Sequence, residues 1–239
     1  MITVTINGEK REYEAGTSYE TIARDYQEQY SSQIALVTVN GKIRELFKKL
    51  KKDCEISFFT VSDGIGHKSY VRTAVMLMIK ALRDVAGTDR LERVKVEFAI
   101  GAGYYCSIKG DLELNEELIE KLNGRMRDLV EADLPYIKKS YPIGDAIEIF
   151  RQQGMKEKEK LFRYRRSSYV NVYCLDGYYD YYYGYMLPRT GYVKHFQVSA
   201  YEDGLMLLLP EAQAPDKLPR IFYLEKRCLP RRCPAALKT

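Results

Sequence analysis

The first sixty residues constrain the fold most, because two Asn-Gly pairs each follow a segment typical of a β-strand. The pair at 7–8 follows the alternating segment ITVTI (2–6), and the pair at 40–41 follows IALVTV (34–39). Asn-Gly is favoured in two-residue hairpin turns, because both residues tolerate positive φ. The pattern therefore predicts that the chain reverses direction at both pairs.

A short helix is predicted between these two hairpin regions. Thr17 is placed to cap a helix that runs from Ser18 to Tyr26, with Glu20 as its capping-box partner. A last strand is expected over 54–59 (CEISFF), after a short connection. The predicted order of strand, strand, helix, strand and strand is that of a β-grasp, or ubiquitin-like, domain, which we place at residues 1–62.

The chain after residue 62 predicts a second unit of mixed helices and strands. Residues 63–66 (DGIG) are typical of a linker, and an apolar stripe over about 69–85 indicates a helix packed on a core. We expect the elements that follow in this order: strands over 94–100 and 104–108, helices over 115–132 and 143–153, and strands over 170–174, 178–183, 191–200 and 205–209. Residues 211–239 are expected to form a poorly ordered or irregular tail.

The composition is compatible with several classes of binding partner and does not identify a particular one. The 239 residues include 38 Lys+Arg and 33 Asp+Glu, so the net charge of +5 permits contact with RNA or anionic metabolites. The 21 Tyr residues indicate an aromatic, partly hydrated surface or cleft. A polar N-terminus, no apolar run of about 18 residues and an odd number of Cys favour a cytoplasmic protein with free thiols. Cys228 and Cys233 could chelate a metal, but their basic surroundings without His disfavour that site.

Two segments carry a resemblance to known families. Residues 1–62 are similar to the TGS domain, which opens threonyl-tRNA synthetases and also occurs in some GTPases and stringent-response enzymes. Residues 170–198 resemble the last motif of the threonyl/alanyl-tRNA synthetase editing domain, with these frame residues in place: Asp180, Gly184, Pro188, Thr190, Gly191, Lys194 and Phe196. The resemblance implies an α+β protein in which the β-grasp domain precedes an editing-like α/β sandwich with a largely antiparallel sheet, at residues 67–210.

The positions that would carry the family's chemistry differ in this chain. The family has two His four residues apart at the start of the domain's first helix, and a Cys and a His in the last motif. These positions fall at Tyr70, Ala74, Tyr182 and Met186, so the resemblance implies neither a zinc site nor any other cofactor. Lys158 and Asp180 match family residues, and together with His67 they are the only catalytic candidates. The predicted ligand- or RNA-binding cleft comprises Tyr70, Ala74, Lys158, Asp180, Tyr182, Met186, Arg163 and Arg165.

Two groups of side chains leave open alternatives. The tyrosines between 178 and 185 can stack on bases, or their rings can alternate on the two faces of a strand and pack there. The basic residues of 156–166 can contact phosphates or can form a solvated, charge-balanced helix face. Lys48 to Lys52 are interpreted as a solvated face, and Lys51 and Lys52 could also meet a partner surface.

A third resemblance is carried by a tyrosine-rich segment, residues 154–173 (GMKEKEKLFRYRRSSYVNVY) and 180–192 (DYYYGYMLPRTGY). It is similar to part of bacterial uridine-kinase-like proteins, in which TGS and editing-like domains precede a P-loop domain. The chain has no G-x-x-x-x-G-K-[ST] motif and no class II synthetase motifs, so we do not expect kinase or ligase activity from it. We expect the chain to be a fragment, a shortened gene product or a stand-alone relative of such a protein. We expect it to recognise RNA or a nucleotide and to regulate a kinase domain that is normally fused downstream. The alternatives are a hydrolase that clears mischarged Thr-tRNA, and an N-terminal fragment of threonyl-tRNA synthetase.

Overall fold

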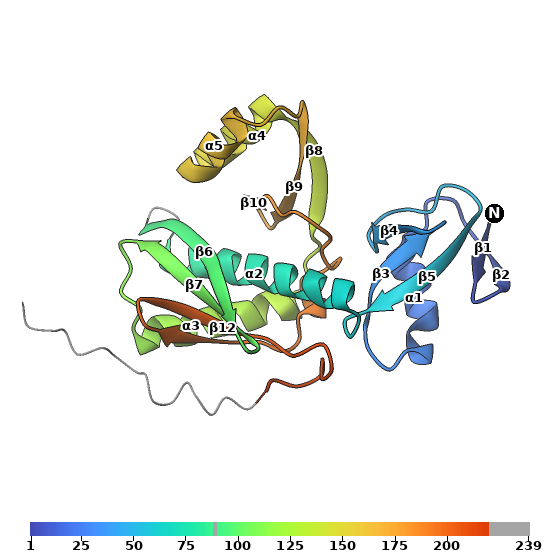
Figure 1. The fold of residues 1–239 in the computed structure, drawn as a ribbon, viewed down its shortest axis with the longest axis horizontal. Coiled ribbons are helices and arrows are strands. Elements are labelled where there is room, and N and C mark those ends of the chain that lie inside the picture. Colours follow the sequence, from blue (N-terminus) through green and yellow to red (C-terminus); the bar gives the residue numbers. More distant parts are fainter. Residues whose placement is uncertain (88–89, 220–239) are drawn as a thin grey trace, which may run out of the picture.

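The computed structural model describes residues 1–87 and 90–219, which form an α+β protein with mostly antiparallel sheets (Figure 1). A small N-terminal domain lies at one end of the molecule, and a long helix leads from it into a larger second part. The fold class expected from the sequence is therefore confirmed. The predicted tail at 211–239 is described only as far as residue 219, where Glu211 and Ala214 form an isolated β-bridge, and the remainder lies outside the described residues.

The N-terminal domain is a β-grasp fold. Its sheet has the order β2-β1-β5-β3-β4, in which β1 and β5 are parallel and the other neighbours are antiparallel. Both Asn-Gly pairs form the predicted hairpin turns, with positive φ at each residue. The elements are β1 (Ile2–Ile6), β2 (Glu9–Tyr13), α1 (Tyr19–Tyr26), the 3-10 turn η1 (Gln27–Gln29), β3 (Ile34–Val39), β4 (Lys42–Glu45) and β5 (Cys54–Thr60).

Two details of this domain differ from the sequence prediction. The chain after the second hairpin turn forms a separate strand, β4, which the pattern of the short segment KIRE does not reveal. The cap of α1 is Ser18, whose Oγ accepts a hydrogen bond from the Thr21 amide at 3.1 Å, and not Thr17. The predicted capping box is therefore wrong, and the Glu20 carboxylate instead pairs with Arg24 at 3.0 Å.

Residues 63–66 are not a linker, because α2 (Gly64–Ala86) begins inside this segment. The Asp63 carboxylate accepts hydrogen bonds from the amide and the hydroxyl of Thr60, at 2.7 and 2.9 Å, and so closes the turn between β5 and α2. A Cβ atom on Gly66 would lie 1.9 Å from the Thr60 carbonyl oxygen. Glycine therefore allows the helix to start directly against the end of the strand.

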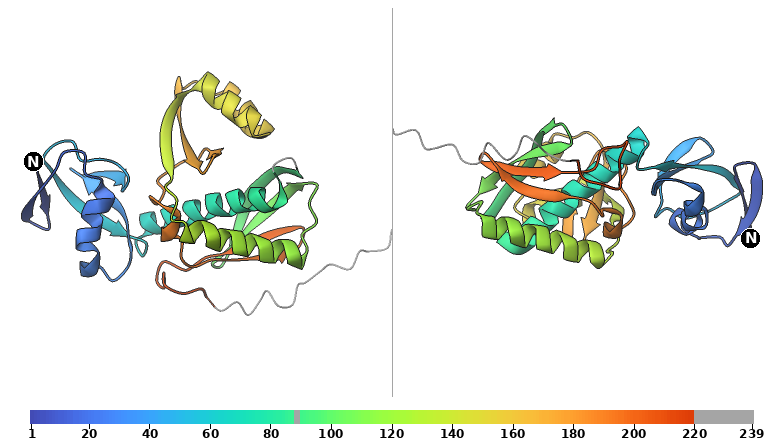
Figure 2. Two further views of the ribbon diagram at one scale, coloured as in Figure 1. Left: turned by 180° about the vertical axis from the view of Figure 1, so that it is seen from behind. Right: turned by 90° about the horizontal axis from the view of Figure 1, so that it is seen from below.

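The second part contains a four-stranded antiparallel sheet in the order β11-β12-β7-β6. Helices α2 and α3 pack side by side against this sheet (Figure 2). The start predicted for α3 at residue 115 is confirmed, and Asn115 is its cap, since Asn115 Oδ1 accepts a hydrogen bond from the Leu118 amide at 2.9 Å. The elements are β6 (Leu91–Ile100), β7 (Gly103–Gly110), α3 (Glu116–Glu131), the 3-10 turn η3 (Thr190–Tyr192), β11 (Gln197–Tyr201) and β12 (Gly204–Leu208).

A smaller layer consists of the three-stranded sheet β10-β9-β8 and two helices beside it (Figure 1). Strand β8 was not predicted from the sequence, and the charged segment after residue 155 forms a helix. The strand expected over 178–183 stops at Asp180, so the predicted alternation of tyrosine rings does not extend to Tyr183. The elements are β8 (Ile137–Pro142), α4 (Ile143–Gln152), α5 (Lys156–Arg163), β9 (Tyr169–Leu175) and β10 (Tyr178–Asp180).

Residues after β10 leave the sheet because they bind to α2. Gly184 has φ of 128°, and a Cβ atom there would lie 2.6 Å from the Arg72 guanidinium carbon. Arg72 Nη1 donates to the Tyr185 carbonyl at 3.1 Å, and the Leu187 amide donates to Thr73 Oγ1 at 3.0 Å. The strand predicted over 191–200 is shorter in the structure, because residues 190–192 form a 3-10 turn and the strand β11 begins only at Gln197.

The two parts of the chain touch through a buried carboxylate. Glu45 of β4 is 2% exposed and lies 3.0 Å from Lys138 Nζ of β8. The Tyr173 hydroxyl also donates to Glu45 and lies 2.9 Å from the Gly184 carbonyl oxygen. No helix among the described residues is both long enough and apolar enough to cross a membrane.

Candidate functional site

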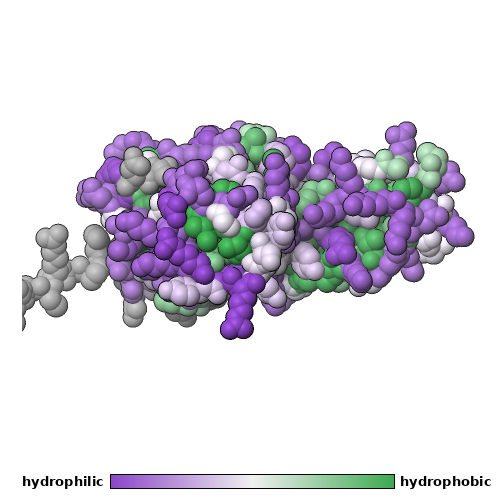
Figure 3. Space-filling view, turned by 90° about the horizontal axis from the view of Figure 1, so that it is seen from above, coloured by the Kyte–Doolittle hydropathy of each residue, from purple (hydrophilic) through white to green (hydrophobic). Residues whose placement is uncertain are grey.

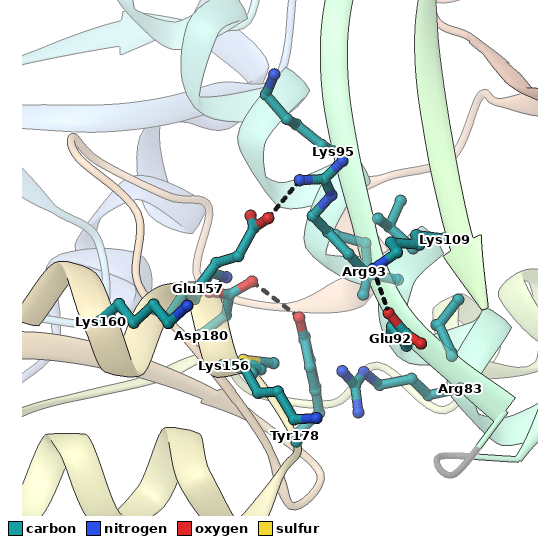
Figure 4. Close-up of a pocket in the computed structure, with 16 residues that line it drawn as sticks. Arg83, Glu92, Arg93, Lys95, Lys109, Lys156, Glu157, Lys160, Tyr178 and Asp180 are labelled. Atoms are coloured by element: carbon teal, nitrogen blue, oxygen red, sulfur yellow. Dashed lines mark hydrogen bonds and ion pairs between the residues drawn. The ribbon is translucent and has the colours of Figure 1, made fainter.

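A cationic cavity of about 390 Å³ lies between the β6–β7 hairpin, the second half of α2, helix α5 and strand β10 (Figure 4). Three carboxylates line it: Glu92, Glu157 and Asp180. The cationic side chains are more numerous: Arg83, Arg93, Lys95, Lys109, Lys156, Lys158 and Lys160. The cavity therefore combines residues from four separate segments and carries an excess of positive charge.

Asp180 is the most deeply buried charged group of the cavity. Its side chain is 2% exposed and forms an ion pair with Lys158, which the first turns of α5 bring opposite the end of β10. The Tyr178 hydroxyl donates to Asp180 Oδ2 at 2.8 Å, and the Tyr181 amide donates to Oδ1. Burial and the adjacent Asp180 raise the pKa of Tyr178 well above its ordinary value, so this hydroxyl stays a donor. The carboxylate is thus already held by three donors.

Arg83 is a buried cation without an acidic partner. It is 7% exposed, and its guanidinium lies 5.4 Å from the centre of the Tyr178 ring. Nη1 donates weakly to the Gln153 carbonyl at 3.3 Å, whereas Nε is buried and has no hydrogen-bond partner. Within residues 1–87 and 90–219, no carboxylate lies within 4 Å of the charged nitrogens of Arg83.

A second buried donor lies in the same cavity. Arg93 pairs with Glu157 through Nη1 at 2.5 Å, but its Nε is also buried and unpartnered. Lys156 and Lys160 likewise take part in none of the ion pairs of the described chain, and both line the cavity. Two guanidinium groups, each with an unpartnered Nε, and two ammonium groups outside any ion pair of the described residues therefore line one cavity, with Arg83 and Lys156 near Tyr178 and Arg93 beside Glu157 (Figure 4). This arrangement suits the oxygens of an anion such as phosphate.

Only Lys158 and Asp180 of the predicted cleft line this cavity. Tyr70, Ala74 and Met186 are at most 4% exposed and belong to the hydrophobic core of the second part. The Tyr70 hydroxyl donates to the His195 carbonyl at 2.8 Å, and burial raises its pKa. Three of the four positions that the resemblance assigns to metal or water ligands are thus packed in the core.

Tyr182, Arg165 and Arg163 lie outside the cavity. Tyr182 and Arg165 line a separate groove, and the Tyr182 hydroxyl is buried without a hydrogen-bond partner. The Arg165 guanidinium lies 5.0 Å from the centre of the Tyr181 ring. Arg163 is 57% exposed and pairs with Glu159 on α5. The basic segment 156–166 is therefore divided between the cavity, the groove and a solvated face.

His67 is too far along α2 to serve the cavity. It lies in the first turn of the helix, whereas the cavity contacts Ile79 and Arg83. Twelve residues at about 1.5 Å each separate His67 from Ile79, or roughly 18 Å. Burial lowers the pKa of His67, with Glu211 opposing the shift. Among the described residues, no group of three or more His, Cys, Asp or Glu side chains could hold a metal ion.

Arg83 and the basic residues of the β6–β7 hairpin line the cavity but were not predicted from the sequence. Arg83 follows the buried Ile79 by four residues, so both lie on one face of α2. An arginine on an apolar stripe was an available signal for a buried cation. Arg93, Lys95 and Lys109 gave no such signal, because exposed strands often carry basic residues.

No family model matches this chain. It is similar to several proteins named threonine–tRNA ligase. It is 26% identical to that of Clostridium kluyveri over 196 residues, which cover 81% of this chain and 30% of the ligase. The ligase of Thermotoga maritima is 27% identical over 194 residues, 80% of this chain and 29% of the ligase. That of Petrotoga mobilis is 28% identical over 202 residues, 83% of this chain and 31% of the ligase.

These similarities relate the chain to a part of threonine–tRNA ligases. The chain spans about 30% of the length of the relatives it matches.

Proposed function

We propose that this chain is a non-catalytic recognition module for RNA or a nucleotide, with tRNA as the first candidate partner. In this proposal a TGS-like β-grasp domain is joined to an editing-type domain whose reactive positions have become packing residues. The observation that carries it is the cationic cavity with the unpaired, buried Arg83. The similarity to threonine–tRNA ligases supports tRNA as the source of the anion.

A phosphate group would bring negative charge into a cavity whose lining carries an excess of positive charge. A buried guanidinium loses hydration, and a buried N–H without a partner costs about 1–3 kcal/mol. A phosphate in the cavity would meet the positive charge of the guanidinium groups of Arg83 and Arg93, and Lys156 and Lys160 would add charge. The same groups offer a neutral ligand of similar size hydrogen bonds but no attraction between opposite charges.

The side chains of the cavity are poorly suited to hydrolysis. Ester cleavage needs a base or an activated water, and His is the usual base near neutral pH. Lys158 and Asp180 pair with each other, and Asp180 also accepts from Tyr178 and from the Tyr181 amide. Neither of the two His residues of the chain lines the cavity.

A finer part of the proposal concerns the larger protein. We propose that the module is the N-terminal part, or a truncated relative, of a uridine-kinase-like protein and regulates a kinase domain. This part rests on the resemblance of the tyrosine-rich segment alone. We propose the cytoplasm as the compartment of this chain, since its proposed partners are RNA and nucleotides.

The test compares a nucleoside with its phosphorylated form. We expect isothermal titration of the full chain to show binding of uridine 5′-monophosphate and of tRNA-Thr, and at least about tenfold weaker binding of uridine. Lys156→Gln with Lys160→Gln should weaken the phosphorylated ligands, and Arg83→Lys should do so as well. Lys121→Gln, on the exposed face of α3, is the matched control. Equal affinity for nucleoside and nucleotide would contradict the proposal.

The second candidate function is hydrolysis of mischarged Thr-tRNA. It is favoured by one observation, the retained Lys158–Asp180 pair beside an open cavity. Incubation of Ser-tRNA-Thr with the purified chain decides between the two functions. We expect deacylation no faster than in buffer. Turnover that Lys158→Ala abolishes would establish the hydrolase and overturn the non-catalytic proposal.

A further inference from the structure

A second basic surface lies between the two parts of the chain, away from the cavity. One groove, of about 550 Å³, has the lysine-rich loop between β4 and β5 on one side and Lys138, Asn171 and Tyr185 on the other. An adjoining groove of about 380 Å³ shares these three residues and continues along Tyr169, Tyr183 and Arg165. Because the two grooves share part of their lining, they form one continuous track, which we call the inter-domain groove. It has no lining residue in common with the cationic cavity.

The positive charge of the inter-domain groove is uncompensated. Lys48, Lys49, Lys51 and Lys52 are exposed, and none of them takes part in an ion pair within the described chain. Within the described residues, Glu45 is the one carboxylate that lines this groove, and Lys138 and Tyr173 already bind it. Nearby anions in solution therefore meet four free ammonium groups on one short loop.

The lysine loop is held in place by the β-grasp core. Leu46 and Leu50 are at most 1% exposed. The Leu50 amide donates to the Thr17 carbonyl at 2.8 Å, and the Lys48 carbonyl accepts from the Tyr19 amide at 2.9 Å. The loop backbone is thus fixed at Lys48 and Leu50, and after the last two lysines Asp53 Oδ1 accepts from the Thr3 amide at 2.9 Å. A surface of this kind loses less conformational entropy when it binds than a mobile loop would.

Exposed aromatic rings lie along the same track. Tyr183 is 87% exposed and Tyr169 is 61% exposed, although both rings are large and partly apolar. Tyr169 and Asn171 are alternate residues of β9, so their side chains lie on the same face of the sheet. The face of the molecule in Figure 3 is mostly hydrophilic, with weakly polar side chains, drawn pale, near the middle where the two parts meet.

We propose that the inter-domain groove binds single-stranded RNA. Ammonium groups spaced along a groove follow a phosphate backbone, and exposed tyrosine rings offer stacking faces to unpaired bases. In a duplex the bases are stacked on one another, so the tyrosines would contribute little there. The proposal extends the proposed RNA recognition to a second site and uses different residues, so either site can fail alone.

Fluorescence anisotropy of the full chain with a labelled 12-nucleotide oligouridylate tests the groove. We expect binding whose affinity falls with added salt. Lys51→Gln with Lys52→Gln should lower the slope of log Kd against log salt by about 1.4, since each contacted phosphate contributes about 0.7 for a single strand. Lys10→Gln with Lys121→Gln, two lysines that line neither groove, should leave the slope unchanged.

Tyr183→Ala tests the stacking contribution. We expect roughly fivefold to 150-fold weaker binding, which corresponds to about 1–3 kcal/mol for a lost base stack. Tyr164→Ala is the matched control, because Tyr164 is 89% exposed and lines neither groove. Both rings are solvated, so circular dichroism should show both variants folded as the wild type.

Three results would overturn the proposal. The first is no binding of the oligonucleotide, or binding that the Lys51 and Lys52 changes leave untouched. The second is equal or tighter binding of a duplex of the same length, which would remove the role of the tyrosines. The third is competition by polyglutamate as strong, per charge, as that by the oligonucleotide, which would indicate an acidic protein partner instead. Introduced into a Lys156→Gln, Lys160→Gln background, the Lys51→Gln and Lys52→Gln changes should lower the salt slope by the same amount, because the groove shares no lining residue with the cavity.

Discussion

The Tyr70 hydroxyl bridges both backbone groups of His195. It donates to the His195 carbonyl oxygen at 2.8 Å and accepts from the His195 amide at 3.1 Å. These bonds join α2 to the segment that precedes β11, 125 residues later in the chain. A position at which the resemblance implies a reactive imidazole therefore holds a structural phenol.

Tyr70→Phe should lower the free energy of unfolding without changing the folded structure. The change removes one hydroxyl and leaves the His195 amide and carbonyl without this partner, which costs about 1–3 kcal/mol. Urea denaturation followed by far-ultraviolet circular dichroism measures the free energy of unfolding. Tyr164→Phe, at an 89% exposed position, is the control and should change it by less than about 0.5 kcal/mol. An unchanged midpoint for Tyr70→Phe would show that water replaces the lost contacts.

Gly66→Ala should be strongly destabilising, because the new methyl group would lie 1.9 Å from the Thr60 carbonyl oxygen. Either β5 or the start of α2 must move, and we expect a loss of about 3 kcal/mol or more. Gly64→Ala is a control in the same helical turn, where nothing lies within 4 Å of the added atom. That variant should gain about 0.5 kcal/mol from the lower entropy of its unfolded chain. Equal melting temperatures of the two variants would contradict the predicted clash.

Lys138→Met should weaken the junction between the two parts. Glu45 is buried, so loss of its ammonium partner at 3.0 Å leaves a carboxylate held only by the Tyr173 hydroxyl. We expect a destabilisation of about 3 kcal/mol. The double variant Glu45→Leu with Lys138→Met removes both charges and should recover much of this loss. Urea denaturation of the single and double variants measures the coupling. A double variant no more stable than Lys138→Met would show that the charges do not interact.

Stability should fall as the pH drops below about 6.5, in part through His67. Burial lowers the pKa of His67 in the folded protein, and the Glu211 carboxylate opposes this only partly. Between the folded and the unfolded pKa, the unfolded chain binds more protons, so unfolding is favoured as the pH falls. His67→Gln removes this contribution. The loss in unfolding free energy between pH 7.5 and pH 5 should therefore be smaller in the variant than in the wild type. A variant with the same or steeper pH dependence would contradict the effect of burial.

Local signals in the sequence determined the N-terminal domain. The two Asn-Gly pairs predict reversals through the φ angles that these residues tolerate, and the two hairpins, β1–β2 and β3–β4, form at these turns. Asn115 predicts the start of α3 in the same way, because its side chain caps the helix within three residues. Such features depend on neighbours in sequence, and a pattern analysis can find them.

The end of β10 shows where local signals fail. A run of tyrosines favours a strand, yet the chain turns away after Asp180. The turn depends on Arg72 and Thr73, more than 110 residues earlier, which bind Tyr185 and Leu187. Propensity carries no information about partners so distant in sequence.

The candidate site was decided by tertiary structure. Sequence alone named Lys158 and Asp180 as candidates, through their match to a known family, and the two side chains form an ion pair in the structure. It could not separate them from Tyr70, Ala74 and Met186, because burial depends on how α2 packs against segments far along the chain. Nor could it bring Arg83 beside the β6–β7 hairpin and α5, since the charge of a cavity is the sum over elements that only folding brings together.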